Sequence, residues 1–412
     1  MRDDVVEISY SEMEPALRAM IAYESNGAFD VRDAQQIFDR LRRQAPVVRW
    51  DMGVGFFTMN DVVTAGRHRA LVSSHPDTWL PLGMGSRGPL PPLHVDGEEH
   101  RRYRKLLDPL LAPKKVAPME SEIRKLADEI IEGFVADGRV ELHDAFCVPL
   151  PSTIFLTLFG TPLEDMDFLV AMKDRILKNE GTTMEEKDAI GVEAGDRMRE
   201  RLRQRLDERR REGAPRDDLI GQFMIFEFDG ERLTDDDIVN IMHLFTIAGL
   251  DTVTSSLSCI FAWFAAHPDE RRRVVADPST LPAAIEELMR FESPVPGSGV
   301  RWATEDIEIN GVPVRRGEMV FLCWAGANVD PATFESPLEV RLDRPVNRHI
   351  AFAAGVHRCL GSHLARLELR AAIDQFHRRI PDYWITLGEE PRYELGGVRQ
   401  ARYLPLTFTA AG

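Results

Sequence analysis

Apolar residues recur three and four positions apart along most of the chain, a spacing typical of helices packed on a core. The segments that follow it predict helices over residues 34–45, 98–112, 119–135, 163–177, 187–212, 219–227, 282–293 and 362–380. β-branched, aromatic and glycine residues gather instead in three β-rich parts, about 47–59, 298–323 and 384–410. Helices therefore dominate, and we expect a mainly α protein with small β-sheets.

The longest apolar pattern begins at Thr234 and runs to about His267, where Pro268 follows. Thr234 and Asp237 have the spacing of a capping box, which satisfies the first backbone N–H groups of a helix. A helix of this length measures roughly 50 Å at 1.5 Å per residue. Because it is apolar nearly all round, we expect it to be buried and to cross the whole molecule.

The chain shows no fixed-period repeat and no long linker rich in Gly, Ser or Pro. We therefore expect residues 1–412 to form a single domain. Residues 74–96 are rich in Pro and Gly and predict a long loop. A loop of that length inside a compact domain is usually functional.

Composition excludes several classes of protein. Apolar residues make up 44% of the 412 residues, which is enough for a large core and argues against disorder. A net charge of −16 repels nucleic acids and anionic lipids at long range. Four widely separated cysteines cannot form a disulfide framework or a zinc cluster. Since no apolar run has the length of a signal peptide or membrane span, we expect a cytoplasmic protein without a membrane anchor.

One group of residues does not suit the middle of a buried helix: Ala248-Gly249-Leu250-Asp251-Thr252. Glycine costs about 1 kcal/mol relative to Ala there, and a buried carboxylate costs more unless it is paired. Threonine can bond back to a carbonyl and bend the helix. Together they indicate a local opening where a ligand or water approaches the backbone. The alternative is a capped, salt-bridged kink without chemistry.

A second group, FAAGVHRCLG at residues 352–361, directly precedes the helix predicted over 362–380. Its glycines permit a tight loop and the close approach of a large flat ligand. Cys359 precedes a helix N-terminus, where free N–H groups favour the thiolate, and His357 and Arg358 add positive charge. Such a thiolate could be a nucleophile or a metal ligand. A buried, inert thiol suits the other cysteines better: Cys147, Cys259 and Cys323.

The pattern FxxGxHxCxG in this group resembles the cysteine loop of the cytochrome P450 family. Glu287 and Arg290 match the family's ExxR motif some seventy residues earlier, and the AGxDT group lies before them in the same order. One departure is Ala353, where the family usually has Gly. The resemblance covers roughly residues 35–410 and implies the cytochrome P450 fold, with the long central helix over a haem. It is closest to the soluble bacterial type.

The resemblance implies how the cofactor would be held. Cys359 would be the axial thiolate ligand of the iron in haem b, a donor that favours O–O cleavage in dioxygen. Backbone N–H groups of the loop, which ends at Gly361, would tune the sulfur, and Phe352 would shield it. The two haem propionates need cationic partners, and the residues at those positions are His100, Arg104, Arg301 and His357.

The resemblance also implies how protons would be delivered. Thr252 would hold the oxygen and an ordered water, and Asp251 would relay protons from solvent or from a salt-bridge network. General acid assistance of this kind is worth roughly 10²–10⁴-fold. Ala248 and Gly249 would face the cofactor beside this pair. A structural network would support the cysteine loop from behind, made of Glu287, Arg290 and Arg344.

By family position, the substrate pocket is lined mostly by apolar residues: Leu82, Met84, Leu90, Leu244, Ile247, Ala248, Val295, Val300 and Val398. They favour hydroxylation or epoxidation of a small to medium apolar molecule of terpenoid, steroid or fatty-acyl type. Arg87 could bind a substrate carboxylate, although a solvent-facing loop arginine is the simpler interpretation. His243 is interpreted as a packed helix histidine.

The electrons must come from a partner, because the chain has no flavin or iron–sulfur motif. We expect NAD(P)H to supply them through a ferredoxin that docks on a basic face around Cys359, and we expect a monomer. The family fold brings these basic residues to that face: Arg101, Arg102, Lys105, Lys114, Lys115, Arg358, Arg366 and Arg370.

Two other functions stay open at this point. A thiol enzyme with Cys359 as nucleophile and His357 as base would leave the ExxR and AGxDT groups unexplained. A non-catalytic haem binder or sensor would keep Cys359 but would have no need of Asp251 and Thr252.

Overall fold

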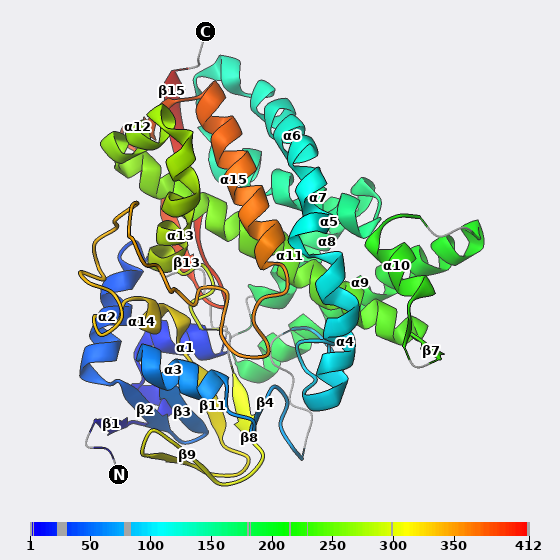
Figure 1. Cartoon of the computed structure of the whole chain (residues 1–412), viewed down its shortest axis with the longest axis vertical. Coiled ribbons are helices and arrows are strands. Elements are labelled where there is room, and N and C mark those ends of the chain that lie inside the picture. Colours follow the sequence, from blue (N-terminus) through cyan, green and yellow to red (C-terminus); the bar gives the residue numbers. More distant parts are fainter. Residues whose placement is uncertain are drawn as a thin grey trace.

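The computed structural model describes residues 2, 4–22, 31–77, 84–178, 181, 183–213, 216–228, 230–297 and 300–409. Helices fill most of the molecule, and the largest sheet lies at the lower left of Figure 1. The predicted mainly α architecture with small β-sheets is therefore confirmed.

The helices over the predicted segments begin and end within a few residues of the predicted bounds. They are α2 (Ala34–Gln44), α4 (Gly97–Leu110), α6 (Glu120–Glu132), α8 (Met166–Leu177), α9 (Met184–Glu212), α10 (Leu219–Ile225), α11 (Asp235–Ala266), α13 (Leu281–Glu292) and α15 (Ser362–Arg379). The pattern did not predict six further helices: α1 (Pro15–Ala22), α3 (Met59–Gly66), α5 (Pro113–Val116), α7 (Pro149–Phe159), α12 (Pro268–Ala276) and α14 (Trp324–Asn328).

Within the described residues, the strands form one six-stranded sheet and four smaller ones. The six-stranded sheet has the order β1 (Val5–Glu7), β2 (Val47–Trp50), β3 (Gly53–Phe56), β11 (Met319–Leu322), β8 (Arg301–Ala303) and β4 (Leu71–Val72). Its β2–β3 pair is the hairpin predicted over 47–59. The small sheets are β9 (Ile307–Ile309) with β10 (Val312–Val314), β6 (Glu227–Phe228) with β7 (Glu231–Arg232), β13 (Arg392–Leu395) with β14 (Arg399–Tyr403), and β12 (Asp382–Ile385)–β15 (Pro405–Thr409)–β5 (Arg139–Glu141).

The long buried helix is confirmed as α11. Thr234 caps it, and the reciprocal capping box with Asp237 is present. Pro268, which was expected only to stop it, is also the first residue of α12, because proline fits the first turn of a helix. α11 is long and apolar enough to cross a membrane, yet 83% of its most apolar stretch is buried inside the protein, as in a core helix.

α11 joins two halves of the hydrophobic core. Its residues up to Leu250 pack with α4, α7, α8 and α9, whereas those from Val253 onward pack with α6, α13 and α15. Between Ile241 and Ala265, every residue is buried except Ala248, Gly249 and Thr252. The group that does not suit a buried helix therefore lies where the two halves of the core meet.

Candidate active site

A cavity of about 710 Å³ lies where the core halves meet. The cysteine loop lines it with Phe352, His357 and Cys359, and α11 lines it with Ala248 and Thr252. Residues more than one hundred positions apart in the sequence thus share one chamber. Its lining is mostly apolar, with charged side chains in a few places.

The cysteine loop is held by short backbone bonds. The Cys359 N–H donates to the Phe352 carbonyl at 2.9 Å, and the Arg358 N–H donates to Gly355 at 3.2 Å. Gly355 has φ +83°, and a Cβ there would overlap the Gly66 carbonyl oxygen of α3. Glycine is therefore required at this point, and the loop is seated directly on α3.

Cys359 lies beside the amino end of α15, as the sequence predicted, and it is an exposed residue that lines the cavity. Burial raises the pKa of the Cys359 thiol. The Gly361 N–H, which bonds the sulfur, and the charges of Arg104 and Arg366 act in the opposite direction. A metal cation bound to the sulfur would displace the proton, because thiolate is the ligand form.

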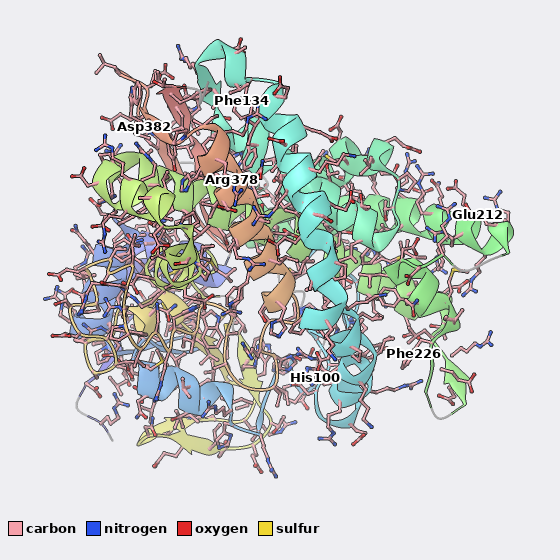
Figure 2. The ribbon with its side chains drawn as sticks, turned by 45° about the horizontal axis from the view of Figure 1, so that its top comes forward. His100, Phe134, Glu212, Phe226, Arg378 and Asp382 are labelled. Atoms are coloured by element: carbon pink, nitrogen blue, oxygen red, sulfur yellow. The ribbon has the colours of Figure 1, made fainter. Side chains whose placement is uncertain are left out.

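Basic side chains gather at the same end of the cavity. His100 of α4 and His357 of the cysteine loop have ring centroids 4.3 Å apart. In Figure 2, His100 lies on α4, below the amino end of α15. Arg301, on β8, donates to the Val300 carbonyl at 2.8 Å, and Arg104 lies 2.8 Å from Asp108.

The electrostatics of this basic cluster fit a ligand with carboxylates. Burial, followed by the charges of His357 and Arg104, lowers the pKa of His100 to about 4, and its buried Nε2 has no hydrogen-bond partner. Two carboxylates contact the cluster: Asp96 lies 2.9 Å from His357 Nε2, and Asp108 lies 2.8 Å from Arg104 Nε. Arg104 and Arg301 supply positive charge here, and the His100 ring has an unsatisfied polar atom, so the site matches the two carboxylates of a haem better than an apolar ligand.

The α11 backbone stays helical from Ala248 to Thr252, so the predicted opening of the helix is wrong. The Thr252 hydroxyl donates to the Ala248 carbonyl at 2.9 Å and so satisfies an acceptor that faces the cavity. A Cβ at Gly249 would lie 2.5 Å from the Phe155 ring. This glycine is thus explained by the packing of α7 against α11.

Asp251 also belongs to the cavity lining and is paired with two lysines. Its Oδ1 lies 2.8 Å from Lys173 Nζ of α8 and 3.2 Å from Lys178 Nζ. Burial opposes the charge of Asp251, yet the two ammonium groups hold the pKa of its carboxyl well below the ordinary range. Its second oxygen, Oδ2, is buried and has no hydrogen-bond partner in the part of the chain that the structure describes. Asp251 is therefore ionised, with one oxygen left to accept another donor.

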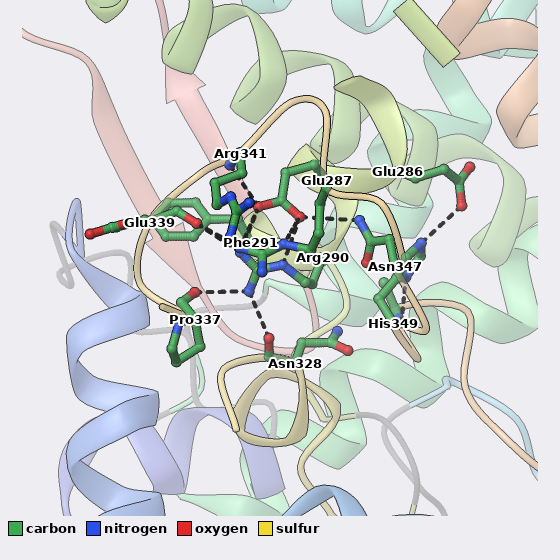
Figure 3. A network of polar contacts seen from close by, with 12 residues as sticks. Glu286, Glu287, Arg290, Phe291, Asn328, Pro337, Glu339, Arg341, Asn347 and His349 are labelled. Atoms are coloured by element: carbon green, nitrogen blue, oxygen red, sulfur yellow. Dashed lines mark hydrogen bonds and ion pairs between the residues drawn. The ribbon is translucent and has the colours of Figure 1, made fainter. Parts of the chain in front are cut away.

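A buried network joins α13 to the segment before the cysteine loop (Figure 3). Glu287 accepts from Arg290 at 2.8 and 2.9 Å and from Arg344 at 2.9 and 3.1 Å. It also accepts from the Arg341 N–H and from Asn347. Burial opposes the charge of Glu287, but these donors keep the pKa of its carboxyl below the ordinary value.

A second set of contacts continues from α13 to the loop itself. Glu286 accepts from Arg366 of α15 at 2.6 Å and pairs with His349 at 2.9 Å. The Arg366 guanidinium stacks over the Phe352 ring, with its carbon 4.2 Å from the ring centroid. Phe352 is thereby fixed in the cavity wall beside Cys359.

The predicted pocket residues divide into three groups. Those that line the cavity are Met84, Leu244, Ile247, Ala248, Val295, Val300 and Val398. Leu90 does not line it, because it is fully buried in the core between α4 and α9. Leu82 lies outside the described residues. Arg87 does not line the cavity either and forms an exposed ion pair with Asp196.

Sequence reasoning missed several polar residues at this site. Lys173 and Lys178 hold Asp251, Asp96 holds His357, and Asn347 completes the contacts to Glu287. The cavity wall also includes Glu368 of α15, which is 2% exposed. Burial raises the pKa of Glu368 to about 8. The side chains that surround each of these residues come from segments that are distant in the sequence.

Known proteins resemble this chain along most of its length. The family model described as Cytochrome P450 matches residues 90–379. A pentalenic acid synthase from Streptomyces avermitilis is 33% identical over 290 residues, 70% of each chain. A steroid C26-monooxygenase from Mycobacterium tuberculosis is 28% identical over 386 residues, 92% of this chain and 94% of its own.

Solved structures show the same fold. The crystal structure of P450BioI in complex with a hexadecenoic acid-ligated acyl carrier protein superimposes with a TM-score of 0.83 and 26% identity. The match covers 92% of this chain and 99% of that chain. The predicted fold is thus confirmed, and bacterial proteins are prominent among the relatives. The chain belongs to the cytochrome P450 family, whose members bind haem through a cysteine thiolate, and it is an oxidoreductase that incorporates oxygen into an organic substrate.

Proposed function

We propose that this protein is a monooxygenase in which the Cys359 thiolate would bind the haem iron and the basic cluster would hold the propionates. The observation that carries the proposal is the shared cavity, which Cys359 and Thr252 both line. When bound, the haem supplies the activation of dioxygen by two electrons and two protons. His100, Arg104, Arg301 and His357 would orient it, and Phe352 would keep water from the sulfur.

Thr252 and Asp251 deliver the protons. The Thr252 hydroxyl donates to the Ala248 carbonyl. Rotation about its C–O bond would let it donate instead to a group in the cavity, while Thr252 stays in the helix. Asp251 is ionised between Lys173 and Lys178 and can accept a proton only when these contacts loosen. Protons then pass from the lysine side of α8 to the Thr252 side of α11.

The substrate is a small to medium apolar molecule that is hydroxylated or epoxidised. Apolar side chains supply most of the cavity wall, among them Leu244, Ile247 and Val295. The named relatives suggest terpenoid and steroid substrates, and P450BioI suggests fatty-acyl substrates. We place this chain in the same range of substrates, as one domain that acts as a cytoplasmic monomer.

The electron donor is a ferredoxin that receives electrons from NAD(P)H. Most basic residues around the cysteine loop are paired with carboxylates: Arg101 with Glu98, Arg366 with Glu286 and Arg370 with Glu120. Arg358 is exposed beside Cys359. We propose that it is the central positive charge of the surface on which the ferredoxin docks. Arg358→Gln should raise the apparent KM for ferredoxin and weaken its salt dependence. Arg272→Gln, on the distant α12, should change neither.

The first experiment is the spectrum of the dithionite-reduced protein with carbon monoxide. A strongly red-shifted Soret band that is lost in Cys359→Ser and kept in Cys147→Ala would support thiolate ligation by Cys359. A folded, haem-supplied protein without a haem spectrum would contradict the proposal and favour a thiol enzyme.

A second measurement separates an oxygenase from a haem sensor. In Thr252→Ala, an oxygenase should continue to consume NAD(P)H while product falls and hydrogen peroxide rises. Unchanged product would refute the role of Thr252 in proton delivery.

A further inference from the structure

The segment Met84–Gly88, which we call the strap, forms part of the cavity wall through Met84 and Gly85. It contacts α9 and α11, two helices that are more than one hundred residues further along the chain. Three different kinds of contact hold it there. None of them involves the cysteine loop or the proton-delivery residues.

The first contact is a hydrogen bond from α11. The His243 Nε2–H donates to the Met84 carbonyl at 2.8 Å, and the ring is fully buried. Burial lowers the pKa of His243 to about 4, so the ring is neutral and carries a single N–H. Because His243 Nδ1 has no hydrogen-bond partner among the described residues, this N–H is used to hold the strap.

The second contact is a notch in α9 made by Gly191 and Gly195. A Cβ on Gly195 would overlap the Gly85 carbonyl group, so the strap lies directly on the helix backbone at this point. Gly85 has φ +61°, and a Cβ on it would lie 2.6 Å from the Gly191 carbonyl oxygen. The fit therefore requires glycine on both sides.

The third contact is the exposed ion pair between Arg87 and Asp196, which follows Gly195 on α9. Arg87 Nη2 and Nε lie 2.6 and 3.0 Å from Asp196 Oδ2. Since both side chains are exposed, this pair adds little stability by itself. It fixes the position of the strap along α9.

We propose that Gly195 is a specificity-determining residue, because it seats the strap on α9 and so sets the width of the chamber in which the substrate lies. This inference rests on the proposed function, which assigns that chamber to the substrate. A side chain at position 195 would push Gly85 off α9 and widen the cavity on that side. Small ligands would then lose contacts that larger ligands keep.

The chain offers a matched control. A Cβ on Gly191 would lie 3.7 Å from its nearest neighbour, the Ile176 carbonyl oxygen, which is ordinary contact. Gly191→Ala and Gly195→Ala change the same residue type one turn apart on α9 and gain the same helix propensity. A difference between them in amide hydrogen exchange therefore reports the seating of the strap.

The two variants should be compared by amide hydrogen exchange over residues 84–93 and by haem spectral titration with a bicyclic monoterpene and a steroid. In Gly195→Ala, we expect exchange at least ten-fold faster and a ratio of dissociation constants shifted at least ten-fold toward the steroid. Gly191→Ala should stay within two-fold of the wild type in exchange. Equal exchange in the two variants, or a wild-type ratio of dissociation constants in Gly195→Ala, would overturn the proposal.

Asp196→Arg provides a second variant in case Gly195→Ala does not fold. It places two like charges at an exposed position and should speed exchange over residues 84–93 by about two- to five-fold. Wild-type exchange in this variant would count against the strap. Exchange needs no bound haem, so a failed strap and a failed haem proposal are distinguishable: the second appears as a missing carbon monoxide band in the wild type.

Discussion

Replacing Glu287 by Gln removes one charge from the most completely buried ion network around the cysteine loop. Glu287 and Arg290 have fully buried side chains, and that of Arg344 is 4% exposed. Each Glu287 oxygen accepts three donors within 3.1 Å. In Gln, one oxygen becomes an NH2 group, so three donors would face another donor and two guanidinium groups would lose their counter-charge.

Two estimates of the loss in the free energy of unfolding overlap. Removing one partner of a buried ion pair costs about 3–5 kcal/mol, and each lost hydrogen bond to a charged group costs about 1.5–3 kcal/mol. We therefore expect Glu287→Gln to lower the free energy of unfolding by at least about 3 kcal/mol. That is a large part of the roughly 5–15 kcal/mol available to a typical protein. The variant should also incorporate less haem, because the network lies behind the cysteine loop.

The assay is urea unfolding of the haem-loaded protein, together with the intensity of the carbon monoxide band. Glu335→Gln is the control, since Glu335 pairs with Arg341 at 3.1 Å but is 85% exposed, and it should change stability by less than about 1 kcal/mol. Because the pKa of Glu287 is lowered on folding, its contribution is present above the ordinary carboxyl pKa and is lost in acid. A Glu287→Gln protein with wild-type stability and full haem content would refute this reasoning.

Three further predictions follow from single residues. Asp251→Asn leaves Lys173 and Lys178 with Asp174 as their ion-pair partner. It should reduce product formation roughly 10²-fold, measured as product per NAD(P)H consumed, whereas the control Asp174→Asn should stay within a few-fold of the wild type. Equal effects of the two substitutions would contradict a relay through Asp251. Ala353 has φ +60°, so Ala353→Gly should raise the free energy of unfolding by about 1 kcal/mol in urea, and a loss of stability would contradict this. The raised pKa of Glu368 means that folded-state stability falls as the pH rises toward 8, by at most about 5 kcal/mol. Glu368→Gln should remove this fall between pH 5 and 9, and an unchanged slope would show that Glu368 is solvated.

Much of the fold was predictable because its signals are local. The capping box at Thr234 and the apolar length of α11 need only neighbouring residues, and both were confirmed. α7 was missed because it is apolar nearly all round, so that its pattern has no polar face to mark a helix. The α12 start at Pro268 was missed because a proline that ends one helix can also begin another.

The candidate site was predictable where a residue type conflicts with its local setting. Asp251 in an apolar helix and Cys359 in a glycine-containing loop are such conflicts. Their partners were not predictable, because Lys173 and Lys178 lie 78 and 73 residues before Asp251. Nothing in the sequence around these lysines distinguishes them from solvated ones. They become buried partners only because α8 packs against α11.

The strap shows the same limit of sequence-based prediction for residues that suit their local settings. Arg87 and His243 suit their local settings, so the sequence favoured a solvent-facing arginine and a packed helix histidine. Both interpretations hold for each residue alone, since Arg87 is exposed and His243 is buried. Their importance comes from the segment that they hold together with Gly195. A residue that satisfies every local rule carries no signal in the sequence, and its role is visible only once the packing of distant helices is known.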